Sequence, residues 1–547
     1  MKMKNTILRI SVLIIAISFG LTKVNAQTFT YGDLNYEVNY DGVSVTVLDH
    51  VDGNDATGTL TIPEYAVYNG NSYAVTVIDD YAFAYSYGIT GSLVLPSTLE
   101  EIGDDAFDYC GFTGVVNIPA SVEYIGYTPF YCCYGIDGFV VDPANEDYDS
   151  RDNCNAIIKR YNNELIIGCK NSTIPNGVES IAEDAFNHCV GLTSIVIPSS
   201  VTEIGGWSFW FTGLTSINIP SSVTYIGENP FAGCVDLAEI TVESGNPVFD
   251  SRNGCNAIVR TSTNELITGC QNTVIPEEVT RIGNDAFYYC STLTGELVIP
   301  ENITSIGEYA FEHCSGLTGS LVIPNTVIEL GESAFAYCTG FDGELIISES
   351  LTSIGSWTFE ECSGFMGSLV IPNSVTTIGS SAFEGCHGFD GSLTLSKGLT
   401  SIESFAFASC EGFNEAIIYA EVPPTLGNYP FGGFGSNKLI VPCGCVSVYE
   451  NSDWHEQFTT IVEDCTLVSK SESNSMSVYP NPTKGLVKIE AEDIKSISIY
   501  NLLGEKLFEC SVNGDAFEYD FGGLEKGLYL FKIETSNGFL TKTITVM

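Results

Sequence analysis

Positively charged side chains are scarce in this chain of 547 residues, which has 21 Lys and Arg against 68 Asp and Glu and a formal net charge of −47. The deficit lies in residues 27–469, where 9 basic residues stand against 57 acidic ones. Binding to nucleic acid or to an anionic lipid surface relies on Lys and Arg contacts with phosphate. We therefore expect neither as a partner, and we interpret the acidic excess chiefly as a solvated surface that keeps the protein soluble.

Catalytic motifs are missing as well. The 5 His are scattered, and the sequence contains no G-x-S-x-G, no H-E-x-x-H and no phosphate-cradling glycine loop. Paired acids such as Asp104-Asp105 and Glu183-Asp184 recur at one position of a repeat, which indicates a solvated face rather than an acid/base dyad. Calcium loops of the D-x-D-x-D-G kind and clustered zinc ligands are not present either. The sequence predicts no enzyme, no cofactor and no metal site.

Long hydrophobic runs are missing except at the N-terminus. There Lys2, Lys4 and Arg9 accompany the apolar run ILRISVLIIAISFGL, and Val24-Asn25-Ala26 supplies the small residues of a cleavage site. The run is shorter than the roughly 20 residues that span a membrane. We predict that residues 1–26 are an export signal, with a membrane anchor as the alternative.

One motif, I-G-x-x-A-F, recurs along the body of the chain. Its Phe residues are spaced by 22 to 24 residues, except for two gaps of 56. A period of this length is typical of solenoids, in which each coil buries its apolar face against its neighbours. The positions are Phe83, Phe107, Phe130, Phe186, Phe209, Phe231, Phe287, Phe311, Phe335, Phe359, Phe383 and Phe407. The pattern predicts a β-rich solenoid with short parallel strands.

Within one unit, residues 317–338, alternation predicts a short strand with Leu321 and Ile323 facing inward. Pro324 ends that strand because proline cannot donate to a ladder. We expect Gly331 at a corner where the backbone bends. The remaining inward positions are Val327, Leu330, Ala334 and Phe335.

The two long gaps contain similar inserts, near residues 141–175 and 242–276, each with two apolar stretches around a polar turn. Each insert is predicted to add a β-hairpin coil. Seven of the 9 basic residues of the body lie in or near them, from Arg151 to Arg281. These inserts are therefore expected to be the electrostatically distinct faces of the solenoid.

Cysteine is abundant, with 19 residues, and falls into two groups. Ten occupy the position three after the repeat Phe, where we favour a buried packing ladder over a metal array. The two inserts each hold a pair 15 residues apart, Cys154 with Cys169 and Cys255 with Cys270. Export permits oxidation, so a disulfide and two free thiols remain alternatives for each pair. Cys443, Cys445 and Cys465 can supply one more disulfide.

The repeat unit I-G-x-x-A-F-x-x-C with L-x-x-L-x-I-P, the N-A-I hairpins, the entry LTIPEYAVYNGNSYAVTVI and the exit PPTLGNYPF resemble the BspA-like leucine-rich repeat family. The similarity covers about residues 31–462. It implies a bacterial surface or secreted protein, in some members an adhesin for host proteins or other cells.

The tail differs in character. The polar stretch TLVSKSESNSM suggests a linker over residues 466–476, and alternating strands bounded by turn signals then predict a small all-β sandwich over 477–547. The Tyr479-Pro480-Asn481-Pro482 opening, the Asn501-Leu502-Leu503-Gly504 turn and the Leu524 to Tyr529 segment resemble the type A C-terminal sorting domain of the type IX secretion system of Bacteroidota. This resemblance implies recognition by the type IX machinery and attachment to surface lipopolysaccharide, although the chain ends in KTITVM where such domains often end in basic residues. The alternative is a plain adhesive sandwich.

The domain order predicted from these features is an export signal (1–26), an N-terminal β cap (27–77), a leucine-rich repeat solenoid (78–465), a linker (466–476) and a sorting domain (477–547). We expect the protein to be secreted across the outer membrane to the cell surface or the extracellular medium.

The outward position of the repeat strand is the best candidate binding site. Exposed contiguous apolar surface often marks a partner site, whereas β-branched residues are also simply favoured in strands. The function predicted is a noncatalytic binding protein, an adhesin for an extracellular protein, a glycan or another cell; the alternative is a structural spacer without a specific ligand. The candidate column consists of Val94, Asn117, Val196, Asn218, Val298, Val322, Ile346, Val370 and Thr394.

Overall fold

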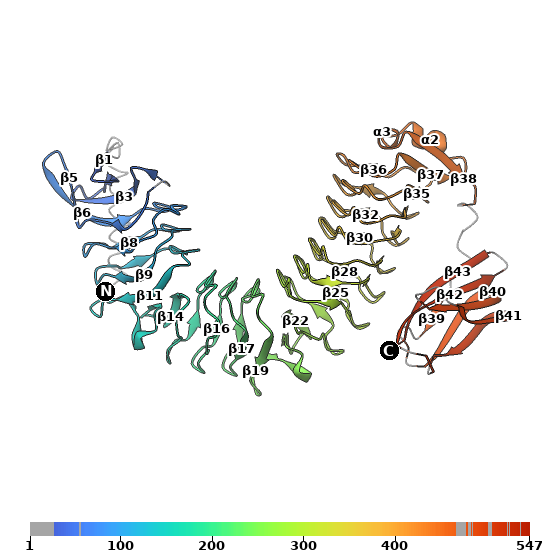
Figure 1. The fold of residues 1–547 in the computed structure, drawn as a ribbon, viewed down its shortest axis with the longest axis horizontal. Coiled ribbons are helices and arrows are strands. Elements are labelled where there is room, and N and C mark those ends of the chain that lie inside the picture. The colour runs from blue at the N-terminus through green and yellow to red at the C-terminus, as the bar shows by residue number, and fades with distance from the viewer. Residues whose placement is uncertain are drawn as a thin grey trace, which may run out of the picture. The chain divides into compact units, whose positions relative to one another are not determined.

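Figure 1 shows the computed structural model, which describes residues 27–53 and 56–466, and 477–479, 483, 485–501, 506–521, 523–524, 526–535 and 538–546 of the tail. The predicted export signal, residues 467–476 of the predicted linker, and residues 480–482 and 502–504 of the sorting motifs lie outside the described residues. The chain forms two compact units, Met1–Gly295 with Ile306–Leu317, and Glu296–Ser305 with Thr318–Met547. No helix among the described residues is long and apolar enough to cross a membrane.

The first unit begins with an antiparallel meander that turns into a parallel stack. β2 pairs antiparallel with β1 and β3, and β3 then pairs in parallel with β6, whose other neighbour β8 belongs to the first repeat coils. The meander covers the end of the solenoid and so protects its edge. These elements are β1 (Thr28–Tyr31), β2 (Leu34–Val38), β3 (Ser44–His50), β4 (Leu60–Thr61), β5 (Tyr65–Tyr68), β6 (Asn71–Ile78), β7 (Leu93–Val94), β8 (Glu101–Ile102), β9 (Gly114–Ile118), β10 (Tyr124–Ile125) and β11 (Ile136–Val141).

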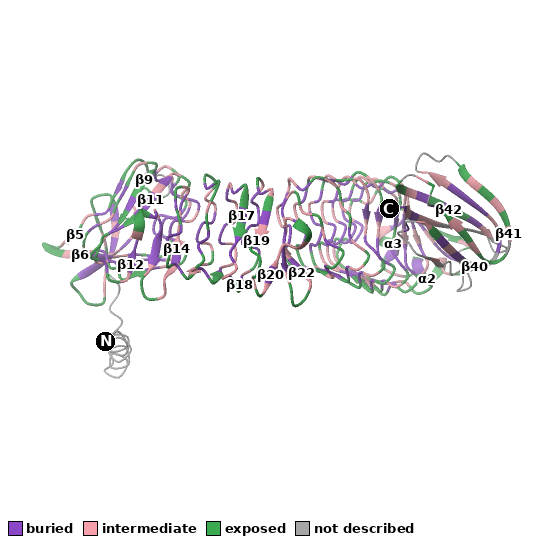
Figure 2. Ribbon diagram, turned by 90° about the horizontal axis from the view of Figure 1, so that it is seen from below, coloured by how far each residue is buried: buried purple, intermediate pink, exposed green. Residues whose placement is uncertain are grey.

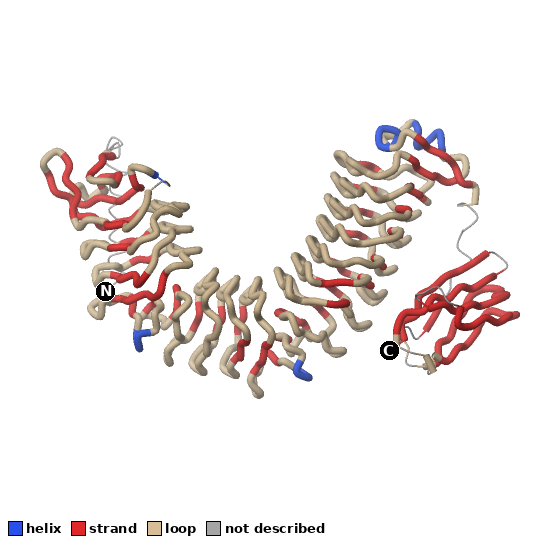
Figure 3. The backbone as a smooth tube through the Cα atoms, viewed as in Figure 1, coloured by secondary structure: helices blue, strands red, loops and turns tan. Residues whose placement is uncertain are grey.

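Each regular coil contributes two short strands, and the solenoid prediction is confirmed (Figures 1 and 3). The predicted L-x-I-P strands stack in parallel on one side, as in β27 with β29 and β31 with β33. The T-x-I segment forms a second parallel strand that the sequence did not reveal to us, as in β30 with β32. Its single inward residue, Ile354 or Ile378, gave too short an alternation to recognise.

The strands of the second unit continue this two-sided arrangement to the last coil. Those of the L-x-I-P side are β27 (Leu321–Val322), β29 (Leu345–Ile346), β31 (Leu369–Val370), β33 (Ser392–Leu395), β35 (Glu415–Ile418), β37 (Lys438–Pro442) and β38 (Thr460–Asp464). Those of the T-x-I side are β30 (Ser353–Ile354), β32 (Thr377–Ile378), β34 (Ser401–Ile402) and β36 (Thr425–Leu426). Further short strands are β23 (Arg281–Ile282), β24 (Gly295–Glu296), β25 (Ser305–Ile306), β26 (Leu317–Thr318) and β28 (Glu329–Leu330).

The two inserts are antiparallel hairpins that feed the parallel sheet. β12, β13 and β14 pair antiparallel, and β14 continues in parallel with β15, β16 and β18; β20 to β23 repeat the order. The first set is β12 (Tyr148–Asp149), β13 (Ile157–Lys159), β14 (Glu164–Ile167), β15 (Ser180–Ile181), β16 (Glu203–Ile204), β17 (Ser216–Ile219), β18 (Tyr225–Ile226) and β19 (Glu239–Val242). The second is β20 (Phe249–Asp250), β21 (Ile258–Arg260) and β22 (Glu265–Thr268). Single 3₁₀ turns, Arg151–Asn153 and Arg252–Gly254, precede β13 and β21.

The repeat Phe side chains form the core. In the second unit Phe335, Phe359, Phe383 and Phe407 stack with ring centroids 5.8, 5.2 and 5.1 Å apart, and all are fully buried. Offset stacking at this distance adds to the burial of large apolar rings. Figure 2 shows the buried positions running along the inside of the coils. Phe130 stacks on Phe107 and also contacts Phe139 of β11, just before the first insert.

The glycine of the repeat is needed for a reason other than the predicted bend. We expected Gly331 to allow a bend, but at equivalent positions the glycine lacks a positive φ and instead lies against the preceding coil. A Cβ on Gly103 would come within 2.6 Å of the backbone nitrogen of Asp80, closer than real Cβ contacts. Close coil spacing therefore requires glycine here.

The last coil is covered by two short helices, α2 (Val446–Glu450) and α3 (Trp454–Gln457). Trp454 and Tyr449 are fully buried, and each donates a side-chain hydrogen bond to a backbone carbonyl of the repeat end, Trp454 to Pro424 at 2.9 Å and Tyr449 to Ala420 at 2.8 Å. These two anchors hold a polar cap over apolar coils, as solenoid ends require.

The tail is all-β, as the sequence predicts, and its described strands form one antiparallel sheet. Its order is β39-β40-β42-β43, with β41 also paired to β40, and a bulge separates Glu490 from Ile494 in the long strand β40. One face buries a separate apolar core that includes Ile497, Phe531 and Ile544. The strands are β39 (Ser477–Tyr479), β40 (Leu486–Asn501), β41 (Lys506–Asp520), β42 (Gly527–Thr535) and β43 (Gly538–Val546).

Candidate functional site

The candidate column lies on the outer side of the L-x-I-P strands. Register places Val322 beside Ile346, Val370 beside Thr394, and Asn218 beside Thr241. Every member is exposed or half-buried; Val196 is 81% exposed, Val298 73% and Val370 56%. Their inward neighbours, for example Leu321 and Leu369, are fully buried. The strand alternation therefore turns the strand members to solvent within each unit. Val196 and Val298 are exposed but lie outside the strands of the structure, so the strands predicted at these two positions are not formed.

Register also extends the column beyond the predicted members. In the second unit Thr394 pairs with Ile417, Ile417 with Ile440, and Ile440 with Val462. In the first unit Val94 pairs with Thr61 and Asn117 with Val140. The alternation in the last coils, AIIYA and KLIVP, was the signal that could have found Ile417 and Ile440. These coils lack the full I-P motif, so the motif does not predict Ile417 and Ile440 as members of the column.

Polar members of the column bond to one another. Thr241 donates to the Asn218 amide oxygen at 2.9 Å, and the Glu243 carboxylate accepts the backbone N–H of Ser221 at 3.0 Å. The hydrogen bonds to the exposed Glu243 carboxylate lower its pKa. This part of the face is a satisfied polar ladder rather than an apolar strip, whereas Val94 and Val196 elsewhere in the first unit are 45% and 81% exposed.

The basic residues of the inserts are paired locally. Arg151 donates from Nε and Nη2 to the two Asp149 oxygens, both at 2.8 Å, and from Nη1 to Asn163 at 3.0 Å. The hydrogen bonds with Asp149 raise the pKa of Arg151. Arg252 repeats this bidentate geometry on Asp250. Both inserts share the tripeptide D-S-R. Its Arg and Asp side chains form the bidentate ion pair that stabilises each hairpin.

Other cations of the inserts are also paired with nearby acidic side chains. Lys159 pairs with Glu164 at 3.0 Å and Lys170 with Asp137 at 2.9 Å. Arg260 lies 3.5 Å from Glu265 and 5.4 Å from the Phe249 ring centroid. These insert cations are consequently balanced by acidic partners close to them.

The insert cysteines are free thiols in the structure, so the alternative without disulfides holds there for Cys154, Cys169, Cys255 and Cys270. Cys154 packs in the core cluster around Phe186, while Cys169 belongs to the cluster on the other side that includes Phe139. The two sulfurs approach separate carbonyls, those of Ala156 and Asn155. Hairpin partners that face opposite sides of a strand layer do not bond to each other.

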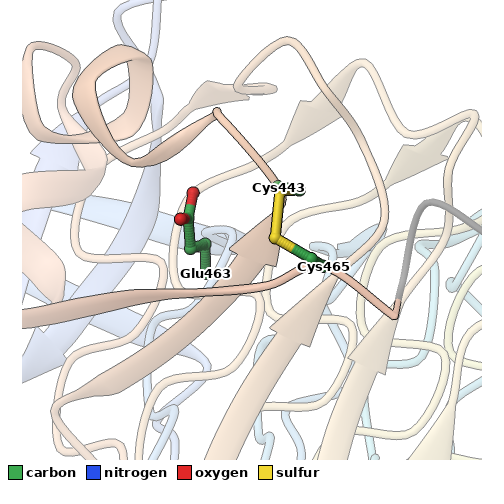
Figure 4. A group of neighbouring side chains, drawn as sticks. All are labelled: Cys443, Glu463 and Cys465. Carbon is green, nitrogen blue, oxygen red and sulfur yellow. A yellow bond between two sulfur atoms is a disulfide. The ribbon is translucent and has the colours of Figure 1, made fainter.

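The disulfide lies instead at the end of the solenoid, between Cys443 and Cys465. The two residues directly follow the paired ends of β37 and β38, where Pro442 lies opposite Asp464. Glu463 lies beside the pair (Figure 4), and its carboxylate accepts the Gly444 N–H at 2.7 Å. Thiolates bind metals, whereas sulfurs in a disulfide have no such charge. The cluster is therefore a cross-link and not a metal site in this form.

Two family models match the chain. The BspA type leucine rich repeat region matches 6 copies over residues 72–150, 157–256, 264–390 and 391–461. The chain belongs to the BspA-type leucine-rich repeat family. The secretion system C-terminal sorting domain matches residues 477–547.

Three solved structures of bacterial leucine-rich repeat proteins are similar to the chain. A leucine rich cell surface protein from Faecalibacterium prausnitzii A2-165 is 24% identical, with 73% of this chain and 96% of that chain covered and a TM-score of 0.46. A leucine-rich repeat protein from Eubacterium ventriosum ATCC 27560 is 17% identical (75% and 95% covered, TM-score 0.43). A third, from Bacteroides ovatus ATCC 8483, is 20% identical (80% and 99% covered, TM-score 0.37). No curated protein matches the chain.

The family and the sorting domain establish where the protein acts. It is secreted to the cell surface or the extracellular space, and its tail is handled by a secretion system. The repeat family is generally noncatalytic. The protein is thus a secreted or surface repeat protein.

Proposed function

We propose that this protein is an adhesin that contacts an extracellular protein or glycan through the outer face of its L-x-I-P strands. The observation that carries the proposal is the apolar column of the second unit, in which Val322 and Ile346, and then Val370, Thr394 and Ile417, follow one another in register. Val370 is 56% exposed, and Val322, Ile346 and Ile417 are half-buried. Apolar surface that continues in this way from coil to coil often marks a partner site. A partner that covers them removes this surface from water.

The proposed attachment runs through the tail. The type IX outer-membrane machinery would read residues 477–547, and surface lipopolysaccharide would receive the processed chain. In this proposal the solenoid is the part presented to the surroundings. Deletion of 477–547 should then retain the protein inside the cell, which fractionation and immunoblotting measure.

The test of the adhesin proposal is binding of the purified protein to arrays of extracellular-matrix proteins and glycans. A parallel sample carries Val322→Lys, Ile346→Lys and Val370→Lys. Saturable binding that the triple variant loses would support the strand face. Binding that survives in the variant would move the site elsewhere.

A structural spacer is the second candidate, favoured by the internally bonded polar ladder of Asn218 and Thr241 in the first unit. A face built only for stability needs no ligand. In that case neither sample binds the arrays in a saturable way.

A further inference from the structure

The two inserts are alike in fold but differ in what lies beside them. Within the first unit, a pocket of about 570 Å³ opens between the coil of residues 123–134 and the coil of residues 182–191, next to the first hairpin. At the matching place beside the second hairpin the space is about 10 Å³. Ligand pockets usually occupy some 300–1,000 Å³, so the first falls in that range and the second does not.

One residue explains much of the difference. Tyr288 follows Phe287 in the second copy, and its ring packs against Trp207 at a centroid distance of 5.8 Å. Its backbone carbonyl accepts the N–H of Gly233 at 3.3 Å, and Asn229 donates to the Asp285 carbonyl, so the two coils are joined. The Tyr288 side chain therefore fills the space beside the second hairpin, and the hydrogen bonds between the two coils close it.

In the first copy Asn187 stands at that place, directly after Phe186. Asn187 is 9% exposed and lines the pocket, and its Oδ1 has no hydrogen-bond partner. Its Nδ2 donates to Asp184 at 2.5 Å. A buried acceptor without a donor costs about 1–3 kcal/mol, and a ligand that supplies a donor would recover that loss.

The lining is aromatic and acidic. Tyr127 donates to the Asp184 carboxylate, and the His188 ring stacks on Phe211 and meets the Tyr131 ring edge to face. Burial lowers the pKa of His188, which keeps its imidazole neutral. The lining cations Lys159 and Lys170 are already paired with Glu164 and Asp137. The aromatic members of the lining include Tyr124, Tyr127, Tyr131, Tyr134, Tyr161 and His188.

The charges left over at the pocket are negative. Glu123 and Glu183 line it and are exposed at its rim, and Asp184 already accepts two hydrogen bonds. Tyrosine faces attract cations, and a guanidinium group is planar, stacks on rings and has five donors and no acceptor. The acceptors and the rings of this pocket therefore complement an arginine side chain better than a neutral or anionic group. The pocket volume leaves room for flanking residues of a peptide.

We propose that this pocket binds an arginine-containing segment of an extracellular polypeptide, at a site separate from the strand-face column. The strongly acidic body would raise the local concentration of such a basic partner. The inference does not depend on the adhesin proposal, because the column variants Val322→Lys, Ile346→Lys and Val370→Lys lie outside the pocket.

The experiment is calorimetric titration of the purified full chain with the peptide Gly-Arg-Gly-Arg-Gly and with its citrulline analogue, which has the same shape without the charge. The test variants exchange pocket residues for those of the second copy: Asn187→Tyr, Tyr131→Ala and Glu183→Asn. Ala232 and Asn284 occupy the matching places of the last two, so these changes are compatible with the fold. The control variant is Glu203→Gln, which changes an exposed acid outside the pocket. Thermal melting checks that every variant is folded.

The arginine peptide is expected to bind at least tenfold more tightly than the citrulline peptide, and each test variant is expected to weaken it tenfold or more while Glu203→Gln leaves it unchanged. If Asn187→Tyr does not fold, Tyr131→Ala and Glu183→Asn decide the matter. Absence of binding by the wild type would overturn the proposal. Equal binding by all variants would overturn it in favour of nonspecific attraction to the acidic surface. Binding of neutral oligosaccharides such as chitotetraose, lost in Asn187→Tyr, together with no discrimination between the peptides would assign the pocket to glycans and overturn it as well.

Discussion

The Cys362 thiol lies 3.0 Å from the backbone carbonyl oxygen of Phe335, one coil earlier, and donates a hydrogen bond to it. The same contact joins Cys386 to Phe359 and Cys410 to Phe383, both at 3.0 Å. A thiol is a small apolar group with one weak donor. The backbone N–H of Cys338, Cys362 or Cys386 already donates to the same carbonyl, at 3.2–3.3 Å. The cysteine column is therefore explained as a set of compact donors that give each of these carbonyls a second hydrogen bond from the next coil.

Replacement of Cys386 tests that role. Cys386→Ala removes both the buried sulfur and the donor to Phe359, and we expect a loss of about 1–2 kcal/mol in unfolding free energy. Cys386→Thr should cost less, because Thr212 already occupies this position in another coil. Urea unfolding followed by circular dichroism measures both. Equal losses in the two variants would mean that the donor contributes nothing.

Thiol reactivity should separate the column from the surface. Burial raises the pKa of Cys110 to about 12, so that at pH 8 only about one thiol in ten thousand is ionised. The half-exposed Cys445 is accessible to reagent. Iodoacetamide at pH 8 should label Cys445 in the native protein long before Cys110, as peptide mass spectrometry would show. Rapid labelling of Cys110 would contradict its burial.

The Cys443–Cys465 disulfide should stabilise the last coils. The bond closes a loop with a sequence separation of 22, for which loop-closure entropy gives about 3 kcal/mol. Changing both residues to Ser should lower the thermal midpoint and expose α2 and α3 to protease. Cys445→Ser, two residues away, is the control and should change neither. Unaltered protease resistance in the double variant would show that the helices hold the cap alone.

Asp285 should make stability depend on pH. Burial raises the pKa of its carboxyl to about 7, and the nearby Glu228 and Glu308 add to the rise. In the unfolded chain the group titrates near 4. Between these values the folded state binds more protons, so the contribution of this group to stability falls as pH rises from about 4 to about 7.

Asp285→Asn removes this dependence. The variant should be more stable than the wild type at pH 8, by about 1–2 kcal/mol, and nearly equal to it at pH 4.5, where the carboxyl of the wild type is protonated in the folded state. Asparagine also suits the positive φ of 54° at this position. Urea midpoints at the two pH values measure the difference. A constant difference between the two proteins at both pH values would show that the carboxyl does not titrate as expected.

Much of this fold could be predicted from the sequence of the repeat. Phe335, Leu321 and Ile323 recur at set intervals, so their inward orientation follows from periodicity. The T-x-I strand could not be predicted from the sequence, because only two of its residues pair in most coils. The glycine was assigned to a bend because close approach to a neighbouring coil, as at Gly103, involves residues that are far away in the sequence of one repeat.

The candidate sites were less predictable for the same reason. The outward orientation of Val370 follows from alternation, whereas the pairing of Arg151 with Asp149 and the missing disulfide of Cys154 depend on which side of the hairpin each side chain takes. The pocket depends on Asn187 in place of Tyr288, a difference whose consequence appears only when two coils face each other.

The most direct test of the adhesin account is the dissociation constant of the strongest array ligand for two triple variants of this protein. One carries Lys at Val322, Ile346 and Val370, and the other carries Lys at Ser353, Thr377 and Ser401, the outward positions of the opposite strands β30, β32 and β34. The account predicts at least tenfold weaker binding for the first variant and unchanged binding for the second. Equal binding by both variants and the wild type would contradict a ligand site on the strand face.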